Sequence, residues 1–218
     1  ANNIVIEGMD IINPKSDALV EQRAAFGEIF FKKRQRRGVN KYEASKLMKD
    51  RNYYGCMMVE TGEADAMISG LSRNYPDTIR PAIQIIGTEE GVSKIAGMYI
   101  MLTKKGPLFL ADTTVNFNPT AEELADITLL VAKEVKTLGI EPRIAMLSYS
   151  NFGSSDTPEA RTVRNARAIV KQKNPSLIVD GEVQGIVAFN KEIMRENYPF
   201  SELVDKGAVN TLIFPNLS

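Results

Sequence analysis

The fold of this chain is decided by residues 107–148, PLFLADTTVNFNPTAEELADITLLVAKEVKTLGIEPRIAMLS. The apolar run Pro107–Asp112 predicts a strand, and Arg143–Ser148 predicts another. Between them, Thr120–Leu138 predicts a helix that begins with a capping box, because Glu123 follows the threonine by three residues. A strand, a capped helix and a strand in succession predict two parallel strands joined by a covering helix.

The same alternation continues on both sides of this unit. Ile95–Thr103 and the strand after it predict a hairpin around Lys104-Lys105-Gly106. The other expected strands are Ile4–Ile12, Tyr54–Glu60, Leu177–Asp180 and Thr211–Phe214, and the other expected helices are Ala18–Lys33, Lys41–Lys49, Thr78–Ile86, Pro158–Lys173 and Val187–Glu196. We therefore expect an α/β fold of three layers, αβα, with a largely parallel sheet. A boundary near Gly87–Gly91 would divide it into lobes 1–88 and 89–218.

Composition narrows the class of partner. Lys+Arg and Asp+Glu both number 27, so the net charge is zero, which argues against nucleic acid as a partner. The sequence has no apolar stretch of the roughly 18 residues that span a membrane, and its first residues lack the order of a signal peptide. We expect a cytoplasmic protein that binds neither membrane nor nucleic acid. Both ends resemble cuts through a longer chain, so we expect the fold to be incomplete at both ends.

Cysteine and histidine usage restricts the chemistry. The single cysteine, Cys56, lies in an apolar run and is expected to be a small buried side chain in a reducing compartment. The chain has no histidine, which removes Ser-His-Asp and Cys-His catalysis and every histidine-ligated metal site within it. We predict no metal site.

Two polar segments follow or precede predicted helices at places suited to anions. GEADAMISG at 62–70 contains Ser69, and Asp77-Thr78-Ile79-Arg80 follows at an expected helix start, where free N–H groups, Thr78 and Arg80 favour a phosphate. The alternative is a solvated loop with Asp77 as an ordinary N-cap. Residues 112–120, with Asn116 and Asn118, offer hydroxyl and amide groups at a second helix start, and capping alone is the alternative.

Two further segments follow predicted strands. SYSNFGSS at 148–155 places Ser148, Ser150 and Ser154 where a strand meets a helix, either as ligand donors or as a flexible polar loop. Asp180 and Glu182 flank a glycine at an expected strand end, either to orient a ligand or as solvated acids in a turn. The basic run 32–38, which contains Arg34, matches a helix C-terminal dipole or an anionic ligand.

These segments, taken in order, resemble the phosphate acetyltransferase family. The blocks are GEADAMISG at 62–70, DTIRPAIQIIGT at 77–88, ADTTVNFNPTAEELADI at 111–127, EPRIAMLSYSNFGS at 141–154, PSLIVDGEVQ at 175–184 and LIFPNLS at 212–218. Four details resemble the version fused behind bacterial NADP-dependent malic enzymes: RNYYGCMM at 51–58, SRNYPDTIRP at 72–81, SNFGS at 150–154 and ENYPFSEL at 196–203.

The resemblance implies a fold like that of isocitrate and isopropylmalate dehydrogenases, with two lobes and a cleft for acetyl-CoA and phosphate. It matches Arg34 to a contact with a CoA phosphate and Arg80 to a ligand of phosphate or acetyl phosphate. The family's catalytic Ser-Arg pair and the Asp after it follow the FPNL strand, so we name no catalytic residue here. NADP and a divalent cation are expected only in a malic domain ahead of this one.

Three functions stay open. The first is a regulatory module that senses acetyl-CoA for a malic enzyme without turnover of its own. The second is an active phosphate acetyltransferase, in which the CoA thiolate attacks acetyl phosphate. The third is a structural domain for assembly, since exposed apolar strands predict at least a dimer.

Overall fold

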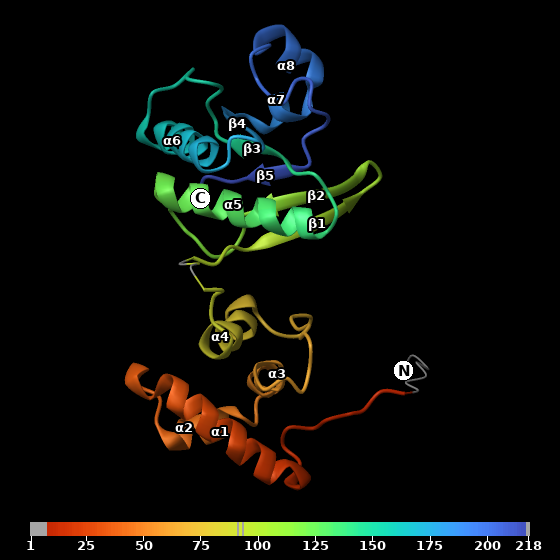
Figure 1. The fold of residues 1–218 in the computed structure, drawn as a ribbon, viewed down its shortest axis with the longest axis vertical. Helices are drawn as coiled ribbons and strands as arrows, with labels where there is room; N and C mark the ends of the chain where they lie inside the picture. Colours follow the sequence, from red (N-terminus) through yellow and green to blue (C-terminus); the bar gives the residue numbers. More distant parts are fainter. Residues whose placement is uncertain (1–7, 91, 93, 217–218) are drawn as a thin grey trace. The chain divides into compact units, whose positions relative to one another are not determined.

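A computed structural model of the chain describes residues 8–90, 92 and 94–216. The chain divides into two compact units, unit 1 from Ala1 to Glu90 and unit 2 from Gly91 to Ser218 (Figure 1). The expected strand Ile4–Ile12 lies partly outside the described residues, and residues 8–12 form no strand.

Every regular element in the described part of unit 1 is helical. These elements are the short 3-10 helices η1 (Asp17–Leu19) and η2 (Gln35–Arg37) and the helices α1 (Val20–Arg34), α2 (Lys41–Leu47), α3 (Arg51–Glu60) and α4 (Tyr75–Ile85). The strand predicted over Tyr54–Glu60 is therefore wrong. Asp50 caps α3, because its carboxylate accepts from the N–H groups of Asn52 at 2.8 Å and Tyr53 at 3.4 Å.

Aromatic side chains form the core of unit 1. Phe26 and Phe30 of α1 pack against Tyr54 and Tyr53 of α3, with ring centroids 5.2 and 5.6 Å apart. Met57 is also buried there. Because α3 buries residues around most of its circumference, it lacks the one-sided apolar stripe that marks a surface helix.

Helix α4 begins earlier than predicted and continues through a proline. Asn74, not Asp77, is its N-cap, and Pro81 lies inside it. A proline lacks the N–H that would bond the carbonyl four residues before, here that of Asp77. The buried side-chain amide of Asn52 donates to that carbonyl at 3.1 Å, so the helix passes the proline without leaving the Asp77 carbonyl unpaired.

Unit 2 contains one five-stranded sheet in the order β1-β2-β5-β3-β4. Its strands are β1 (Met98–Thr103), β2 (Gly106–Ala111), β3 (Arg143–Leu147), β4 (Ile178–Val183) and β5 (Thr211–Ile213). β1 and β2 form the predicted antiparallel hairpin, and β2, β5, β3 and β4 are parallel neighbours. The largely parallel sheet is confirmed.

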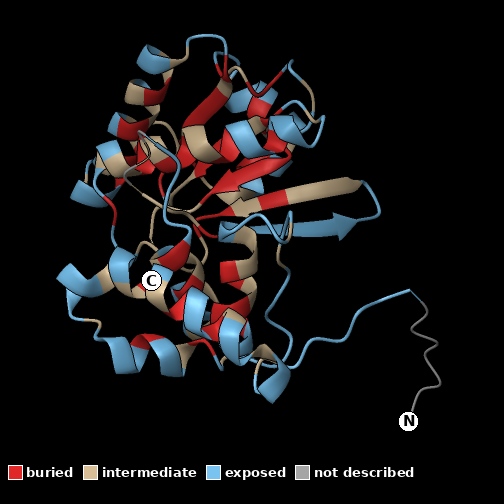
Figure 2. Ribbon diagram, turned by 60° about the horizontal axis from the view of Figure 1, so that its bottom comes forward, coloured by how far each residue is buried: buried red, intermediate tan, exposed pale blue. Residues whose placement is uncertain are grey.

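Helices cover both faces of this sheet. α5 (Ala121–Thr137) and α6 (Pro158–Lys173) pack on the face that carries Phe109, Ile144 and Ile213. The opposite face, with Ala145 and Leu212, packs against α7 (Gly185–Phe189), α8 (Lys191–Asn197) and residues 203–209. Figure 2 shows the buried strands between these layers. The single helix predicted over Val187–Glu196 is two helices, because Asn190 leaves the helical conformation and caps α8.

Helix α6 is tied to β4 and the chain after it by charge. Three basic side chains of α6 each reach an acidic partner: Arg164 reaches Glu182 at 2.9 Å, Arg167 reaches Asp180 at 3.2 Å, and Lys171 reaches Glu202 at 2.7 Å. Asp180 and Glu182 are almost fully buried. The three pairs lie on one side of the helix and fix its position over the sheet edge.

The hairpin strand β1 is exposed along most of its length (Figure 2). Four consecutive apolar side chains, Tyr99, Ile100, Met101 and Leu102, are 53%, 49%, 49% and 86% exposed. In the described part of the chain, no helix has the length and apolarity that a membrane span requires.

Candidate functional site

The carboxyl ends of the four parallel strands meet at one edge of the unit 2 sheet. Residues 112–120 leave β2, residues 148–157 leave β3, and residues 214–216 leave β5 at this edge. In open α/β sheets, ligands bind beyond the carboxyl ends of the strands. This edge is therefore the candidate site of unit 2.

Asp112 organises the loop that leaves β2. Its carboxylate accepts from the N–H groups of Gly97 at 2.9 Å, Thr114 at 3.0 Å and Val115 at 3.1 Å, and from the N–H group and side-chain amide of Asn116 at 2.7 and 2.5 Å. Glycine at position 97 allows this close approach, because a Cβ there would lie 2.0 Å from the Thr114 hydroxyl and would displace the Thr114 side chain. Burial alone would raise the pKa of Asp112, but these hydrogen bonds outweigh it and lower the pKa.

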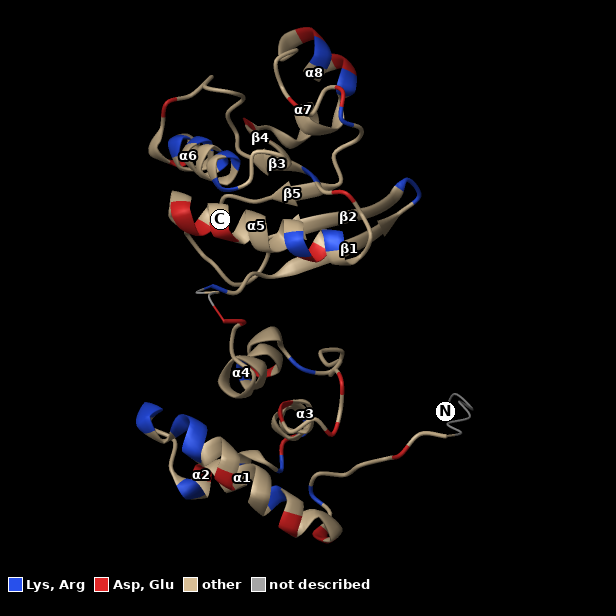
Figure 3. Ribbon diagram, in the orientation of Figure 1, with Lys and Arg blue, Asp and Glu red and all other residues tan. Residues whose placement is uncertain are grey.

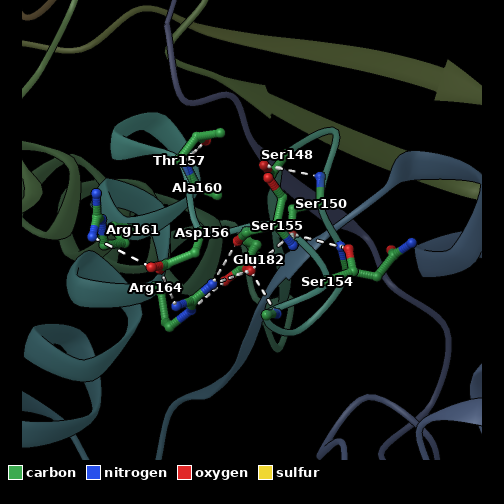
Figure 4. A network of polar contacts seen from close by, with 12 residues as sticks. Ser148, Ser150, Ser154, Ser155, Asp156, Thr157, Ala160, Arg161, Arg164 and Glu182 are labelled. Atoms are coloured by element: carbon green, nitrogen blue, oxygen red, sulfur yellow. Dashed lines mark hydrogen bonds and ion pairs between the residues drawn. The ribbon is translucent and has the colours of Figure 1, made fainter.

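Glu182 has the same function for the loop that leaves β3 (Figure 4). Its carboxylate accepts from the Ser150 hydroxyl at 3.1 Å, the Gly153 N–H at 2.7 Å and the Arg164 guanidinium at 2.9 and 3.2 Å. The side chain is fully buried. Burial acts to raise the pKa of Glu182, but hydrogen bonds from Arg164, Gly153 and Ser150 lower it, so the group is an ionised acceptor at neutral pH.

The predicted serines hold this loop together. Ser150 and Ser154 share a hydrogen bond of 3.1 Å, and the Ser148 hydroxyl accepts from the Ser150 N–H at 3.2 Å. The Ser154 hydroxyl also accepts from the N–H of Asn151 at 2.9 Å. Because Ser150 is buried and bonded to Glu182, it is part of the framework of the loop.

A hollow of about 130 Å³ opens where the loops after β2 and β5 meet the start of α6. Thr120 caps α5 through the predicted capping box, which is confirmed, and Thr157 caps α6. The lining consists of amide, hydroxyl, carboxylate and proline groups, from Asn118, Pro119, Pro158, Glu159, Thr162, Pro215 and Asn216. The negative charge of the Glu159 carboxylate would repel a phosphate ion, so this hollow suits a neutral polar group such as an amide.

Unit 1 contains both predicted arginines, Arg34 at the end of α1 and Arg80 within α4. Burial raises the pKa of the Tyr53 hydroxyl, while the positive charges of Arg80 and Arg34 both act to lower it. The two guanidinium groups therefore lie within electrostatic reach of the same atom. Further basic residues, Lys32 and Lys33, lie in the last turn of α1, and Arg36 and Arg37 follow in η2. The ribbon at this end of α1 is coloured blue in Figure 3.

Both arginines have donors to spare. The Nε of Arg34 is buried and has no hydrogen-bond partner among the described residues, which is costly for a charged donor. Arg80 has one distant ion pair, 3.9 Å to Asp77, and its side chain is 59% exposed. The unpaired buried donor of Arg34 and the exposed guanidinium of Arg80 could each complete their hydrogen bonds with an anionic ligand.

Ser69 and Thr78 border a different hollow of unit 1. This one measures about 330 Å³ and is mainly apolar, with Cys56, Met67 and Ile86 in its wall. The Ser69 hydroxyl donates to Asn52 at 2.8 Å, and the Thr78 hydroxyl donates to the Asn74 carbonyl at 3.2 Å. Both hydroxyls are engaged within the unit. Helix α4 begins at Tyr75, so the predicted helix start at Thr78 is wrong, while the assignment of Thr78 and Arg80 to an anionic ligand stays a prediction.

Two other predicted residues are placed away from an open site. Asp180 lies inside β4, not at its end, and accepts from Ser201 at 2.8 Å beside Arg167. The side-chain amide of Asn116 donates to the Asp112 carboxylate and to the Ile95 carbonyl. Asn118 alone among the predicted residues of unit 2 borders the hollow at the strand edge.

Sequence reasoning passed over several groups that build these sites. Tyr53 lies just ahead of the strand predicted over Tyr54–Glu60 and was assigned to no element, and Arg164 was expected only as a residue of the helix Pro158–Lys173. Thr162 gave no signal, because a threonine inside a helix has no distinctive spacing. Within the described ranges, no group of three acidic or cysteine side chains could hold a metal ion.

Comparison with known proteins decides the family. A family model described as Phosphate acetyl/butaryl transferase matches residues 1–218. The chain belongs to this family. It is 37% identical over 216 residues to the phosphate acetyltransferase of Bacillus subtilis, a match that covers 99% of this chain and 65% of that protein.

A second kind of relative joins the same region to a longer protein. This phosphate acetyl/butaryl transferase family chain is 39% identical over 209 residues to the NADP-dependent malic enzyme of Escherichia coli, covering 95% of this chain and 27% of that enzyme. A phosphotransacetylase structure from Streptococcus pyogenes matches with a TM-score of 0.79 and 36% identity, over 94% of this chain and 61% of that chain. The chain thus spans about a quarter of the malic enzyme and under two thirds of the phosphate acetyltransferase.

Proposed function

We propose that this chain is an acetyl-CoA-sensing regulatory domain of an NADP-dependent malic enzyme and has no turnover of its own. The observation that carries the proposal is the pair of donors that remain unused in unit 1: the buried Nε of Arg34, which has no partner among the described residues, and the exposed guanidinium of Arg80. A planar fork of N–H donors suits the phosphate groups of CoA or a phosphate ion. The identity to malic enzymes supports the choice of parent protein.

The ionised carboxylates at the strand ends support a ligand-binding function rather than acid–base catalysis. Asp112 and Glu182 both have lowered pKa values and are saturated with hydrogen bonds, so neither is suited to take up or release a proton near neutral pH. The whole sequence has no histidine. Burial raises the pKa of Cys56 to about 11, which keeps its thiol protonated and unreactive in a reducing cytoplasm.

In this proposal, the domain acts on a malic domain of the same protein. NADP and a divalent cation belong to that malic domain, which oxidatively decarboxylates malate to pyruvate. Acetyl-CoA changes its activity through a coupling free energy, typically about 1–3 kcal/mol. In this proposal the two lobes are 1–88 and 89–218, and Asn118 is the predicted polar contact in the second.

Titration of the intact malic enzyme with acetyl-CoA, while malate oxidation is followed by NADPH absorbance, tests the regulatory role. The rate is expected to change saturably with acetyl-CoA. Arg80→Ala is expected to weaken acetyl-CoA binding at least fivefold by calorimetry, because a ligand-bound guanidinium is worth more than the roughly 1 kcal/mol of an exposed ion pair. Arg195→Ala, which removes an exposed arginine of α8 that lies 3.9 Å from Asp205, is the matched control. Equal affinity in both variants removes Arg80 from the site.

The main alternative is an active acetyltransferase that interconverts acetyl-CoA plus phosphate with acetyl phosphate plus CoA. The name of the Bacillus subtilis relative favours it. Incubation of the chain with acetyl-CoA and phosphate, followed by a hydroxamate assay for acetyl phosphate, separates the two functions. Turnover well above the rate without protein would overturn the regulatory proposal.

A second candidate function is assembly, and strand β1 favours it. Its exposed, uncharged run Tyr99–Leu102 is the kind of sheet edge that natural proteins cover or pair. A second copy could pair with it antiparallel across a twofold axis, which predicts at least a dimer. Leu102→Lys should then shift sedimentation towards monomer, whereas Leu138→Lys, at an exposed site on α5, should not.

A further inference from the structure

An apolar hollow of unit 2 lies at the opposite edge of the sheet from the candidate site. It measures about 450 Å³ and lies where β2, β3 and the chain before β5 begin, beside the end of α7. This volume is within the range of small-molecule sites, about 300–1,000 Å³. Leu108, Ile140, Phe189 and Val209 form much of its wall.

Arg143 contributes a fixed guanidinium to this hollow. Its Nε donates to the Ala208 carbonyl at 2.5 Å. Its side chain lies against Gly207, where an added Cβ would come within 3.1 Å of Cδ and 3.2 Å of Nε. The missing side chain at Gly207 therefore makes room for the arginine. In the described part of the chain, the two terminal Nη groups have no hydrogen-bond or ion-pair partner.

Lys105 contributes a second positive charge from the hairpin turn. The turn is ordered, since the Thr103 hydroxyl donates to the Gly106 carbonyl at 2.7 Å and accepts from the Lys105 N–H at 3.1 Å. The Lys105 ammonium has no partner among the residues that the structure describes. The neighbouring acid Glu141 faces Lys136 at 3.9 Å instead, so the hollow itself carries net positive charge.

Apolar walls with two cations at the rim specify the chemistry of an occupant. We propose that this hollow binds an amphipathic carboxylate, with the carboxylate on Arg143 and Lys105 and an apolar chain against Leu108, Ile140 and Phe189. The fork of two Nη donors matches the two oxygens of a carboxylate, and apolar surface on the chain gains from leaving water. The hollow lies at the amino ends of the strands, opposite the candidate site of unit 2, and its lining includes none of Arg34, Arg80 and Asn118.

Octanoate is a suitable probe, because it joins one carboxylate to an apolar chain. In ¹H–¹⁵N NMR titrations of the chain, octanoate should shift the amide signals of Leu108, Ile140 and Val209 saturably. Acetate, which lacks the chain, and 1-octanol, which lacks the charge, should each shift them less at equal concentration. Shifts confined to Tyr99–Leu102 of β1, or no saturable shift, would overturn the proposal.

Substitutions then test which residues bind the carboxylate and which contact the apolar chain. Arg143→Gln is expected to weaken octanoate binding about tenfold, the effect of losing a charged hydrogen-bond pair. Lys105→Gln should weaken octanoate binding severalfold, and it should not affect folding because Lys105 lies in an exposed turn. Phe189→Ala should also weaken octanoate binding severalfold, because it removes apolar surface from the wall of the hollow. Arg195→Gln, an exposed arginine of α8 paired at 3.9 Å with Asp205, is the matched control and should leave affinity unchanged.

If Arg143→Gln and Lys105→Gln bind octanoate with the same affinity as the control variant, the proposed site is wrong. Acetyl-CoA added to the same samples should not displace octanoate. Displacement would mean that octanoate occupies the acetyl-CoA site, whereas loss of acetyl-CoA binding with octanoate binding intact would count against the proposed function alone.

Discussion

Glu182→Gln tests whether a single buried carboxylate fixes the loop after β3. The substitution keeps the shape of the side chain but removes the charge that accepts from Arg164, Gly153 and Ser150. It also turns one acceptor into an amide that faces these donors. Removing one partner of a buried ion pair costs about 3–5 kcal/mol.

The lower end of that range applies here, because Arg164 keeps access to solvent. Its side chain is 38% exposed and also lies 3.5 Å from Asp156, so its charge stays solvated after the substitution. We therefore expect a loss of about 3 kcal/mol in the free energy of unfolding of unit 2. With a urea m-value of about 2 kcal/mol/M, the midpoint should fall by about 1.5 M.

Urea unfolding followed by circular dichroism measures this loss, and amide exchange at Gly153 assigns it to unit 2. Glu134→Gln, on the exposed side of α5, is the matched control and should cost less than about 0.5 kcal/mol. Because the folded-state pKa of Glu182 is lowered, its contribution is full above the ordinary glutamate pKa of 4.5 and disappears as pH falls through the lowered value. The difference between wild type and variant should therefore shrink in acid. A midpoint within 0.3 M of the control at pH 7, at a measurement precision of about 0.1 M, would refute the reasoning.

Three further substitutions test the framework by the same urea assay. Asn52→Ala should cost about 1–3 kcal/mol, because it leaves the Asp77 carbonyl without its donor beside Pro81, and a loss no larger than that of an exposed control would contradict this role. Thr120→Ala should cost about 1 kcal/mol through the lost cap of α5, with Thr120→Ser restoring most of it. Gly181→Ala should cost more than about 4 kcal/mol, since its Cβ would lie 2.4 Å from a backbone oxygen, and a variant of normal stability would disprove that close approach.

The elements around β2, α5 and β3 were predictable because their signals are local. A capping box marks the start of α5. The strands are apolar runs, and their successive residues point to opposite faces of the sheet, both of which are covered by helices. The helix α6 was predicted with both of its ends, because Pro158 and Asn174 lie at its ends. Strand order and edges depend on contacts between distant segments, so the sequence left them open.

Helix α3 shows where local signals fail. The run Tyr54–Val59 is apolar without a helical period, because α3 is buried on several sides, and short apolar runs of this kind do not separate strand from helix. The Asp50 cap was the available signal. Similarly, the start of α4 was misplaced because Asn74 and Asp77 are both plausible caps, and tertiary contacts of Asn52 allow Pro81 inside the helix.

At the candidate site, residue types were predictable but their partners were not. Polar side chains were expected after β2 and β3 and lie there, yet Asn116 and Ser150 are bonded to Asp112 and Glu182. Glu182 lies 32 positions from Ser150, so no local pattern could connect them. The assignments of Arg34 and Arg80 to phosphate remain predictions for the binding experiments.

The ion pairs of α6 also set how the protein responds to salt. Counter-ions screen exposed charges strongly and buried ones weakly. The ties to β4 end on Asp180 and Glu182, which are shielded from solvent, whereas Lys173 meets Asp126 of α5 with both side chains well exposed. Rising ionic strength should therefore weaken the Lys173–Asp126 pair before it weakens the ties between α6 and β4, while the apolar core between α5 and α6 keeps the two helices packed.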